Sequence, residues 1–304
     1  MQATIREASP IVSEFERRAA ETMLRMSDNA QIRVLHHPAP AASRNGLSML
    51  FIGGWSTGLA GWDFATVEFA RDFDVYYLET REKRSSVLHP DSVNDLARLS
   101  SDLCESIEHF GLDQSRLVIF GSSWGGVIAA QALADSKLSP MLTVFRGPIM
   151  RFRIPPLTRY VVPVVPPGLF EAVKPLLRTW LIRQRAATPE QAAFYLDILD
   201  DADPIKWKSV GRHIAMANFQ ALYSAIDSPT LIISTDAGDK FHTDGEAYQI
   251  AALMRDCGHV TVRDFKEMNS PIIVDLVRAH LAGITARSPD ALPSIAGDRS
   301  RAAG

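Results

Sequence analysis

The chain has 304 residues, of which 46% are hydrophobic and 22% charged, and its formal net charge is −3. This length allows one large α/β domain or two ordinary domains, and the composition is typical of a soluble globular enzyme. The small net charge and the lack of a basic repeat exclude nucleic acid as an expected partner. The two cysteines, Cys104 and Cys257, lack metal-ligand spacing and argue against a disulfide framework.

No stretch of the sequence approaches the roughly 20 apolar residues that a transmembrane helix needs. Charged residues from Glu14 to Arg18 interrupt the N-terminal segment, so we expect no signal peptide. The sequence therefore predicts a cytoplasmic protein whose partner is a small molecule, without a cofactor or a bound metal. A peripheral contact with a membrane surface stays open, and the sequence does not determine the oligomeric state.

Strand and helix patterns alternate along most of the chain. Residues 11–27 place apolar side chains on one side, which predicts an amphipathic N-terminal helix in a leading segment, 1–29. Apolar runs predict strands at 32–35, 48–52, 74–78, 117–120, 141–145, 230–234 and 260–265. Periodic segments predict helices at 62–73, 91–110, 127–133, 246–254 and 272–281. The second of these helices is expected to begin at a cap, Asp91 or Ser92, and to end before Gly111. This order is typical of an α/β fold with a mostly parallel, doubly wound sheet.

One stretch interrupts the alternation. Between 147 and 228 no convincing strand is present, and prolines alternate with helical patterns near 169–185, 189–198 and 210–223. We therefore predict a helical cap, 147–228, inserted into a core domain formed by 30–146 and 229–285. The cap is expected to lie over the carboxyl edge of the sheet. The tail 286–304 is rich in Ala, Ser, Pro and Gly and is predicted to be disordered.

The most informative motif is a G-x-S-x-G sequence formed by Gly121, Ser123 and Gly125. It stands between a predicted strand and a predicted helix, which is the context of a nucleophile elbow. The strained turn projects the Ser123 hydroxyl above the sheet edge, and a side chain at either glycine would collide with the adjacent strand or helix. The backbone N–H of Trp124, at the start of the helix, is placed to stabilise an oxyanion. Ser123 is therefore the predicted nucleophile.

With this motif the chain resembles the α/β-hydrolase family, in its form with a helical cap, over about residues 30–285. The segment Gly53-Gly54-Trp55 follows a predicted strand, as the family's oxyanion loop does. Gly53 stands where the family usually has a histidine. The resemblance implies that the backbone N–H of Trp55 is the second oxyanion donor beside that of Trp124.

The same resemblance assigns the catalytic acid to the loop after the strand 230–234. Asp239 fits this role best, and Asp236 is the alternative. The family's catalytic histidine lies in the loop after the last strand, yet that loop, 266–271, contains no histidine here. The family's proton shuttle is therefore missing from its usual position.

His242 is the predicted substitute for that histidine. It follows Asp239 by three residues, in a loop at the carboxyl edge of the sheet. An imidazole needs only to reach the serine oxygen and to have an acceptor on its other nitrogen, for which Asp239, Asp236 and Glu267 are candidates. The alternative is that His242 is a solvated loop residue, and the cap residue His213 would then be the next candidate.

Basic residues follow two of the predicted strands. Arg146 and Arg153 come after the strand 141–145, and a charged run, 79–84, follows the strand 74–78. Because arginine binds carboxylates and phosphates with two parallel hydrogen bonds, we predict Arg146 and Arg153, with Gly54, as substrate-binding residues. The apolar cap stretch 161–177 is expected to pack on the core or to line an acyl pocket, with a membrane-docking patch as the alternative.

These residues predict a serine hydrolase that acts on an acyl ester or thioester, with an anionic group on the substrate, through a covalent acyl-enzyme. The missing histidine in the loop 266–271 keeps a second function open. That alternative is a protein of the same fold without ordinary hydrolase activity, with a role in acyl transfer, a lyase-like reaction, or binding.

Overall fold

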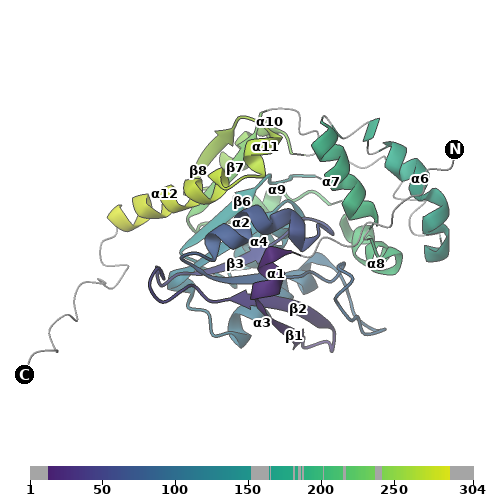
Figure 1. The fold of residues 1–304 in the computed structure, drawn as a ribbon, viewed down its shortest axis with the longest axis horizontal. Helices are drawn as coiled ribbons and strands as arrows, with labels where there is room; N and C mark the ends of the chain where they lie inside the picture. The colour runs from purple at the N-terminus through teal and green to yellow at the C-terminus, as the bar shows by residue number, and fades with distance from the viewer. Residues whose placement is uncertain are drawn as a thin grey trace, which may run out of the picture.

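A computed structural model of the chain describes residues 13–151, 166–180, 182–183, 188–200, 202–214, 217–236 and 242–287, together with positions 164 and 186. In this described part, eight strands form one sheet in the order β1-β2-β4-β3-β5-β6-β7-β8 (Figure 1). The strands are β1 (Ala20–Arg25), β2 (Gln31–His37), β3 (Ser48–Ile52), β4 (Asp74–Leu78), β5 (Leu117–Ser122), β6 (Leu142–Arg146), β7 (Thr230–Thr235) and β8 (Cys257–Val262).

The pairing of the strands makes the sheet mostly parallel. Neighbours from β4 to β8 run parallel, whereas β1 and β2 join one edge in antiparallel pairing. Ile52 at the end of β3 pairs with Gly121, and Ser122 at the end of β5 pairs with Arg146. This register brings the carboxyl ends of three central strands to one edge. The predicted fold class is confirmed.

Helices cover both faces of the sheet, so the central strands are buried on both sides. Leu50 and Ile52 of β3 pack with one helical layer, whereas Met49 and Phe51 pack with the other. The first layer contains α3 (Leu96–His109), α4 (Trp124–Ala134), α9 (Gln220–Ser224) and α10 (Asp244–Ala251). The second contains α1 (Glu14–Arg18), α2 (Asp63–Phe69) and α12 (Ile272–Arg287). Short helices complete the core: η1 (Leu59–Trp62), η2 (Gln114–Arg116) and α11 (Phe265–Met268).

The predicted N-terminal helix over 11–27 is wrong in its second half. The helix α1 ends at Arg18, and β1 begins at Ala20 and pairs with β2. Leu24 is buried while Met23 is 39% exposed, so alternation with period two governs this segment and not helical periodicity. The turn between β1 and β2 contains Asn29 in the left-handed region, with φ of 68°. Residues 1–12 lie outside the described part.

Two other predicted boundaries are corrected by capping. The long helix after β4 begins at Leu96 and is capped by Asp95, whose carboxylate accepts the Arg98 N–H at 2.8 Å; neither Asp91 nor Ser92 is the cap. The last strand, β8, ends at Val262 because Asp264 caps α11. Because β8 begins at Cys257, His259 lies inside this strand, whereas the predicted range 260–265 places it before the strand.

Several described helices between β6 and β7 gather at one end of the molecule (Figure 1). They are η3 (Pro167–Leu169), α6 (Phe170–Trp180), α7 (Pro189–Asp200) and α8 (Pro204–Ile214). The predicted helix 210–223 is two helices, α8 and α9, and α9 packs on α4 of the core. The helix α12 extends to Arg287, beyond the predicted start of the tail at 286, and residues 288–304 lie outside the described part. Among the described helices, none combines the length and the apolar character that crossing a membrane requires.

Candidate active site

The predicted elbow has the geometry of a strained turn. Ser123 stands between β5 and α4 with φ of 50° and ψ of −111°, a conformation that residues with a side chain rarely adopt. A Cβ atom at Gly121 would lie 2.7 Å from the Cα of Gly126. A Cβ atom at Gly125 would collide with the carbonyl oxygen of Ile52, the last residue of β3, and would lie 2.6 Å from that of Gly53. The collisions expected from the sequence are therefore present, one with the helix and one with the strand.

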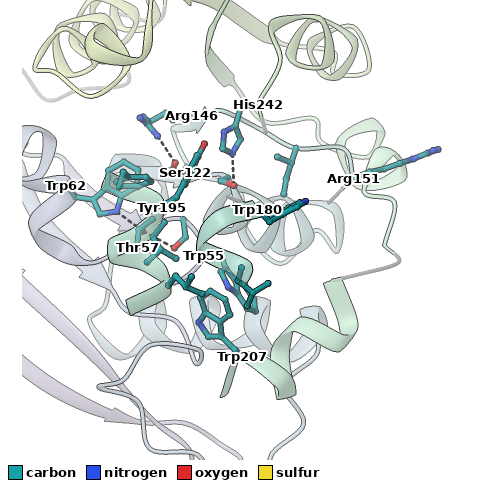
Figure 2. Close-up of a pocket in the computed structure, with 17 residues that line it drawn as sticks. Trp55, Thr57, Trp62, Ser122, Arg146, Arg151, Trp180, Tyr195, Trp207 and His242 are labelled. Carbon is teal, nitrogen blue, oxygen red and sulfur yellow. Dashed lines mark hydrogen bonds between the residues drawn. The ribbon is translucent and has the colours of Figure 1, made fainter. Parts of the chain in front are cut away.

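His242 and Ser123 are in hydrogen-bond contact, although 119 positions separate them in the chain. The Nε2 atom of His242 lies 2.9 Å from the Ser123 Oγ (Figure 2). The backbone at Gly147, with φ of 55°, makes room for this ring, because a Cβ there would lie 3.1 Å from it. Directly after His242, the Thr243 side chain caps α10 by accepting the Glu246 N–H. His242 thus lies directly before a capped helix.

The other predicted catalytic residues are not brought to this pair by described contacts. Asp239 lies outside the described residues, and so does the side chain of His213. Asp236 is exposed after the end of β7. The Glu267 carboxylate accepts the backbone N–H of Arg263 at 2.8 Å and pairs with its guanidinium at 2.9 Å. The identity of the acid stays a prediction.

The predicted oxyanion loop lies against the elbow. A Cβ atom at Gly54 would be 3.7 Å from the Cβ of Ser123, so the backbone of this loop passes beside the serine. Trp55 follows directly, and its ring contacts that of Trp124 edge to face, with centroids 6.0 Å apart. Trp124 is the first residue of α4, where backbone N–H groups have no acceptor within the helix.

Packing explains the glycine that stands where the family usually has a histidine. A Cβ atom at Gly53 would lie 2.8 Å from the Tyr77 hydroxyl and 3.0 Å from Trp62 Nε1 and Thr57 Oγ1. Burial raises the pKa of Tyr77 well above its ordinary value, so this phenol stays neutral behind the loop. The side chains of neighbouring elements thus fill the space that a larger residue would need.

Ser123 and His242 open into a cavity of about 240 Å³ whose walls are mainly apolar and include several aromatic side chains (Figure 2). The core and the oxyanion loop contribute one wall, and α6, α7 and α8 of the predicted cap contribute the other. Four of the five tryptophans of the chain line it: Trp55, Trp62, Trp180 and Trp207. The remaining apolar or aromatic lining residues are Ile149, Leu177, Phe194, Tyr195, Ile198 and Leu199.

Arg146 brings a buried positive charge to this cavity. Its side chain lines the wall, and the residue is only 8% exposed. The guanidinium donates to the Met268 carbonyl at 3.0 Å, to Asn269 Oδ1 at 2.7 Å and to Ser122 Oγ at 3.1 Å. It also lies over the ring of Trp62, 5.0 Å from the centroid. These neutral contacts hold a cation within the lining of the cavity.

The other predicted binding residues have different outcomes. Gly54 lines the cavity, and Arg153 lies outside the described residues. Arg151 also lines the cavity, from an exposed position.

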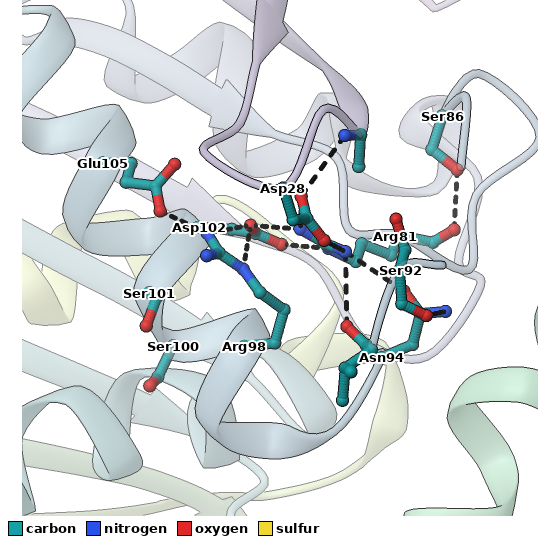
Figure 3. A network of polar contacts seen from close by, with 12 residues as sticks. Asp28, Arg81, Ser86, Ser92, Asn94, Arg98, Ser100, Ser101, Asp102 and Glu105 are labelled. Atoms are coloured by element: carbon teal, nitrogen blue, oxygen red, sulfur yellow. Dashed lines mark hydrogen bonds and ion pairs between the residues drawn. The ribbon is translucent and has the colours of Figure 1, made fainter. Parts of the chain in front are cut away.

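The charged run 79–84 after β4 lies mostly inside the fold, and none of its residues lines the cavity. Arg81 is fully buried and makes paired hydrogen bonds to Asp102, at 2.6 and 2.8 Å, and to Asp28, at 2.6 and 2.9 Å (Figure 3). Glu82 and Lys83 are also buried. Sequence reasoning missed this inward orientation, because a charged loop is usually solvated and the partners come from distant parts of the chain.

Comparison with known proteins identifies the family of this chain. A sequence model of the alpha/beta hydrolase family matches residues 49–268, more than two thirds of the chain. The chain belongs to the alpha/beta hydrolase family. The match runs from β3, before the oxyanion loop, to the end of α11, and so it includes Ser123 and His242.

Several hydrolases of known structure share the fold. A thermophilic esterase from Thermogutta terrifontis, solved with malate bound, aligns with 88% of this chain and 98% of its own, at 17% identity and a TM-score of 0.68. An esterase from Exiguobacterium antarcticum aligns over 86% and 100%, at 16% identity and a TM-score of 0.66. An enol-lactonase from Burkholderia xenovorans LB400 aligns over 84% and 97%, at 17% identity and a TM-score of 0.62. No curated protein sequence gives a significant match.

Proposed function

We propose that this alpha/beta hydrolase cleaves an acyl ester or thioester through a covalent intermediate on Ser123. The observation that carries the proposal is the 2.9 Å contact between His242 Nε2 and Ser123 Oγ at the strained elbow. A serine hydroxyl is a weak nucleophile unless a base accepts its proton, and an imidazole at hydrogen-bond distance is such a base. The contact supplies this base from a different loop than the one usual in the family.

The reaction that follows from this geometry has two halves. Ser123 Oγ attacks the carbonyl carbon while His242 Nε2 takes the hydroxyl proton, and the carbonyl electron pair moves to the oxygen. The backbone N–H groups of Trp55 and Trp124 are the proposed donors to that oxyanion. The bond to the leaving oxygen or sulfur then breaks, and His242 returns the proton to it. Water repeats the sequence on the acyl-enzyme and releases the acid.

The lining of the cavity supports a substrate with an apolar body and an anionic group. Aromatic side chains surround the space beside Ser123 and favour an apolar acyl or aryl moiety. Of the two arginines in the lining, the buried Arg146 suits a carboxylate better than the exposed Arg151, since a buried guanidinium attracts an anion more strongly than a solvated one. We therefore propose an acyl ester or thioester that carries a carboxylate.

A matched pair of substrates tests the anionic group. Aryl esters of butyrate and of succinate have the same acyl length, but only the second carries a free carboxylate. We expect kcat/KM to be higher for the succinate ester. Arg146→Gln should lower the ratio of kcat/KM for the two esters about tenfold or more, which is the effect of losing one charge-assisted hydrogen bond. Arg151→Gln is the comparison variant. An unchanged preference in Arg146→Gln would assign the anion to another residue.

The catalytic acid is tested by a second pair of variants. We propose Asp239 as the partner that orients His242. Asp239→Asn is expected to lower kcat by a factor of roughly 10²–10⁴, whereas Asp236→Asn should stay close to wild type. The reverse result would assign the role to Asp236, which is exposed after the end of β7.

The alternative function, a fold member without hydrolase activity, rested on the missing histidine in the loop 266–271. The contact of His242 with Ser123 weakens that reasoning. An ester hydrolysis assay on wild type and Ser123→Ala separates the two functions. Activity that depends on Ser123 supports the hydrolase, and equal rates in both proteins would support the alternative.

A further inference from the structure

A buried lysine is bonded to the proposed oxyanion loop. Lys83, from the loop after β4, is 8% exposed. Its ammonium group donates to the carbonyl oxygen of Gly54 at 3.1 Å and to that of Thr57 at 2.7 Å. Burying an ammonium group is costly unless hydrogen bonds replace its water, and these carbonyls are part of that replacement. The charge is therefore held directly behind the turn that contains Trp55.

The Gly54 carbonyl belongs to the same peptide unit as the N–H of Trp55. This peptide bond is trans, so its N–H points away from its C=O. Thr57 adds two hydrogen bonds to the same oxygen, from its hydroxyl at 2.9 Å and from its backbone N–H at 3.2 Å. Hydrogen bonds to a carbonyl polarise the whole peptide and make its N–H a stronger donor, and a cationic donor does so most.

The loop that carries Lys83 is itself tied to the cap. Lys206 of α8 donates to three backbone carbonyls of this loop, at 2.6 to 2.9 Å. Trp207, also on α8, donates from its indole to the Ser56 hydroxyl, and the Glu82 carboxylate accepts the Ser56 N–H at 3.3 Å. Ser56 has φ of 47°, so these contacts hold the turn in a conformation that it would not keep alone.

We propose that Lys83 is a positioning residue that orients and polarises the Gly54–Trp55 peptide, so that the Trp55 N–H binds the reaction's oxyanion more strongly. This inference rests on the proposed function, because it assumes that a carbonyl oxygen gains negative charge beside Ser123. The polarised N–H matters most when that charge develops. Loss of Lys83 should therefore lower kcat and leave KM nearly unchanged.

The expected loss in kcat can be estimated from the effect of removing oxyanion donors in other enzymes. Removing a whole donor costs a factor of about 10²–10³ in kcat. Lys83→Met keeps the Trp55 N–H and removes only its polarisation, so we expect a loss of about tenfold in kcat. Lys137→Met is the matched control, since this lysine lies on the surface after α4 and is 41% exposed. It should hydrolyse esters like wild type.

A second variant and a resting-state measurement separate positioning from folding. Lys83→Gln keeps a hydrogen-bond donor without the charge, and its kcat should fall between those of wild type and Lys83→Met. In protein labelled with ¹⁵N-tryptophan, the Trp55 amide proton should move upfield in both variants, because a less polarised N–H is less deshielded. This spectrum requires no turnover, so it tests the polarisation even if wild type hydrolyses no ester.

The outcomes distinguish the two proposals. A wild type without ester hydrolysis or Ser123 labelling would overturn the proposed function, while the amide shift would still report on Lys83. Hydrolysis in wild type with unchanged kcat in Lys83→Met would overturn the positioning role. So would a loss that appears only in KM, an unmoved Trp55 amide, or a loss explained by a lower melting temperature. If Lys83→Met does not fold, Lys83→Gln decides by the same criteria.

Discussion

Ser123 has an unfavourable backbone conformation that the surrounding structure maintains. For a residue with a side chain, the conformation with φ of 50° and ψ of −111° costs on the order of 1–3 kcal/mol of folding free energy. The backbone is fixed on both sides, since the Ser123 N–H donates to the Arg146 carbonyl at 3.0 Å and its own carbonyl accepts the Val127 N–H at 3.2 Å. This backbone conformation keeps the Ser123 hydroxyl within hydrogen-bond reach of His242.

Relief of this strain is measurable when the hydroxyl is removed in two ways. Ser123→Gly and Ser123→Ala both lose the nucleophile, but only glycine adopts this conformation without a steric penalty. Glycine also loses more backbone entropy on folding, which offsets part of this gain. We therefore expect the unfolding free energy of Ser123→Gly to exceed that of Ser123→Ala by about 1 kcal/mol. Urea unfolding of the two variants checks this. A less stable glycine variant would show that the turn is not strained.

At the scale of residues, the sequence predicts a feature well when its determinants are local. The elbow is contained in five residues, and each of its glycines is explained by a collision with its neighbours. The contact of His242 with Ser123 depends on two loops that meet only in the fold, so the sequence left a solvated loop residue as the alternative. The inward Lys83 had no local signal, because a lysine in a charged run normally faces water.

At the scale of elements, the site depends on the close approach of β3, β5 and α4. Gly125 of α4 lies against the carbonyls of Ile52, the last residue of β3, and of Gly53, the first residue of the predicted oxyanion loop. This close packing fixes the position of the first turn of α4 relative to the end of β3. This contact couples the position of the nucleophile to that of the oxyanion donors.

A single methyl group tests that contact. Gly125→Ala must displace backbone atoms, so we expect a loss of about 1–3 kcal/mol in stability and more than tenfold in kcat/KM. Gly283→Ala, in α12, is the matched control, because a Cβ there meets no atom within 4 Å. It should retain activity and gain up to about 1 kcal/mol in stability. Full activity in Gly125→Ala would contradict the tight packing.

Element positions were predicted best where strands are buried on both faces. The predicted strands 48–52 and 74–78 coincide with β3 and β4. The N-terminal segment was mistaken for a helix because its apolar residues fit both periods, and only pairing with β2 decides for a strand. Tertiary pairing cannot be read from local periodicity.

The buried Arg81 connects two elements that the sequence did not relate. Its guanidinium joins Asp28, in the turn between β1 and β2, to Asp102 of α3 (Figure 3). Burial opposes ionisation of Asp28, but the hydrogen bonds and charge of Arg81 outweigh it and lower the pKa from 3.8 to about 2. For Asp102, burial dominates and raises the pKa. The gain in stability from ionisation therefore comes from Asp28.

This pair predicts a defined pH dependence. Because the folded pKa of Asp28 lies below its ordinary value of 3.8, its stabilisation is present above about pH 4 and is lost as the pH falls toward 2. Asp28→Asn should lower the unfolding free energy by about 1–2 kcal/mol at pH 7, and the difference from wild type should shrink below pH 4. Urea unfolding from pH 7 to pH 3 measures it. Asp227→Asn is the control, because this side chain is 75% exposed. If the difference in unfolding free energy between Asp28→Asn and wild type did not change with pH, the assignment would be contradicted.

At the scale of the whole molecule, the cavity exists only because the predicted cap and the core meet. The core supplies Ser123 and His242, and α6, α7 and α8 supply much of the aromatic and apolar wall. Sequence reasoning predicted this insertion from the prolines that interrupt the strand pattern, and α6, α7 and α8 are described helices between β6 and β7. It did not indicate which cap residues face the core, since that depends on how the helices dock.

Neighbouring leucines of α6 test that docking. Leu177 lines the cavity, whereas Leu176 is 72% exposed. Leu177→Ala should raise KM for esters with a bulky apolar acyl group by about 3- to 10-fold, the cost of lost apolar contact, with less effect on acetate esters. Leu176→Ala should behave as wild type. Steady-state kinetics with both ester sizes measures these values of KM. A raised KM in Leu176→Ala and an unchanged KM in Leu177→Ala would contradict this orientation of α6.

The most direct test of the central claim is the mass of the protein after treatment with a fluorophosphonate, followed by peptide mapping. If Ser123 is the nucleophile and His242 its base, wild type gains one phosphonyl group on Ser123, and Ser123→Ala gains none. His242→Ala should react at least about 100-fold more slowly while it keeps the melting temperature of wild type. A folded wild type without the adduct, an adduct on another residue, or an undiminished rate in His242→Ala would contradict the claim.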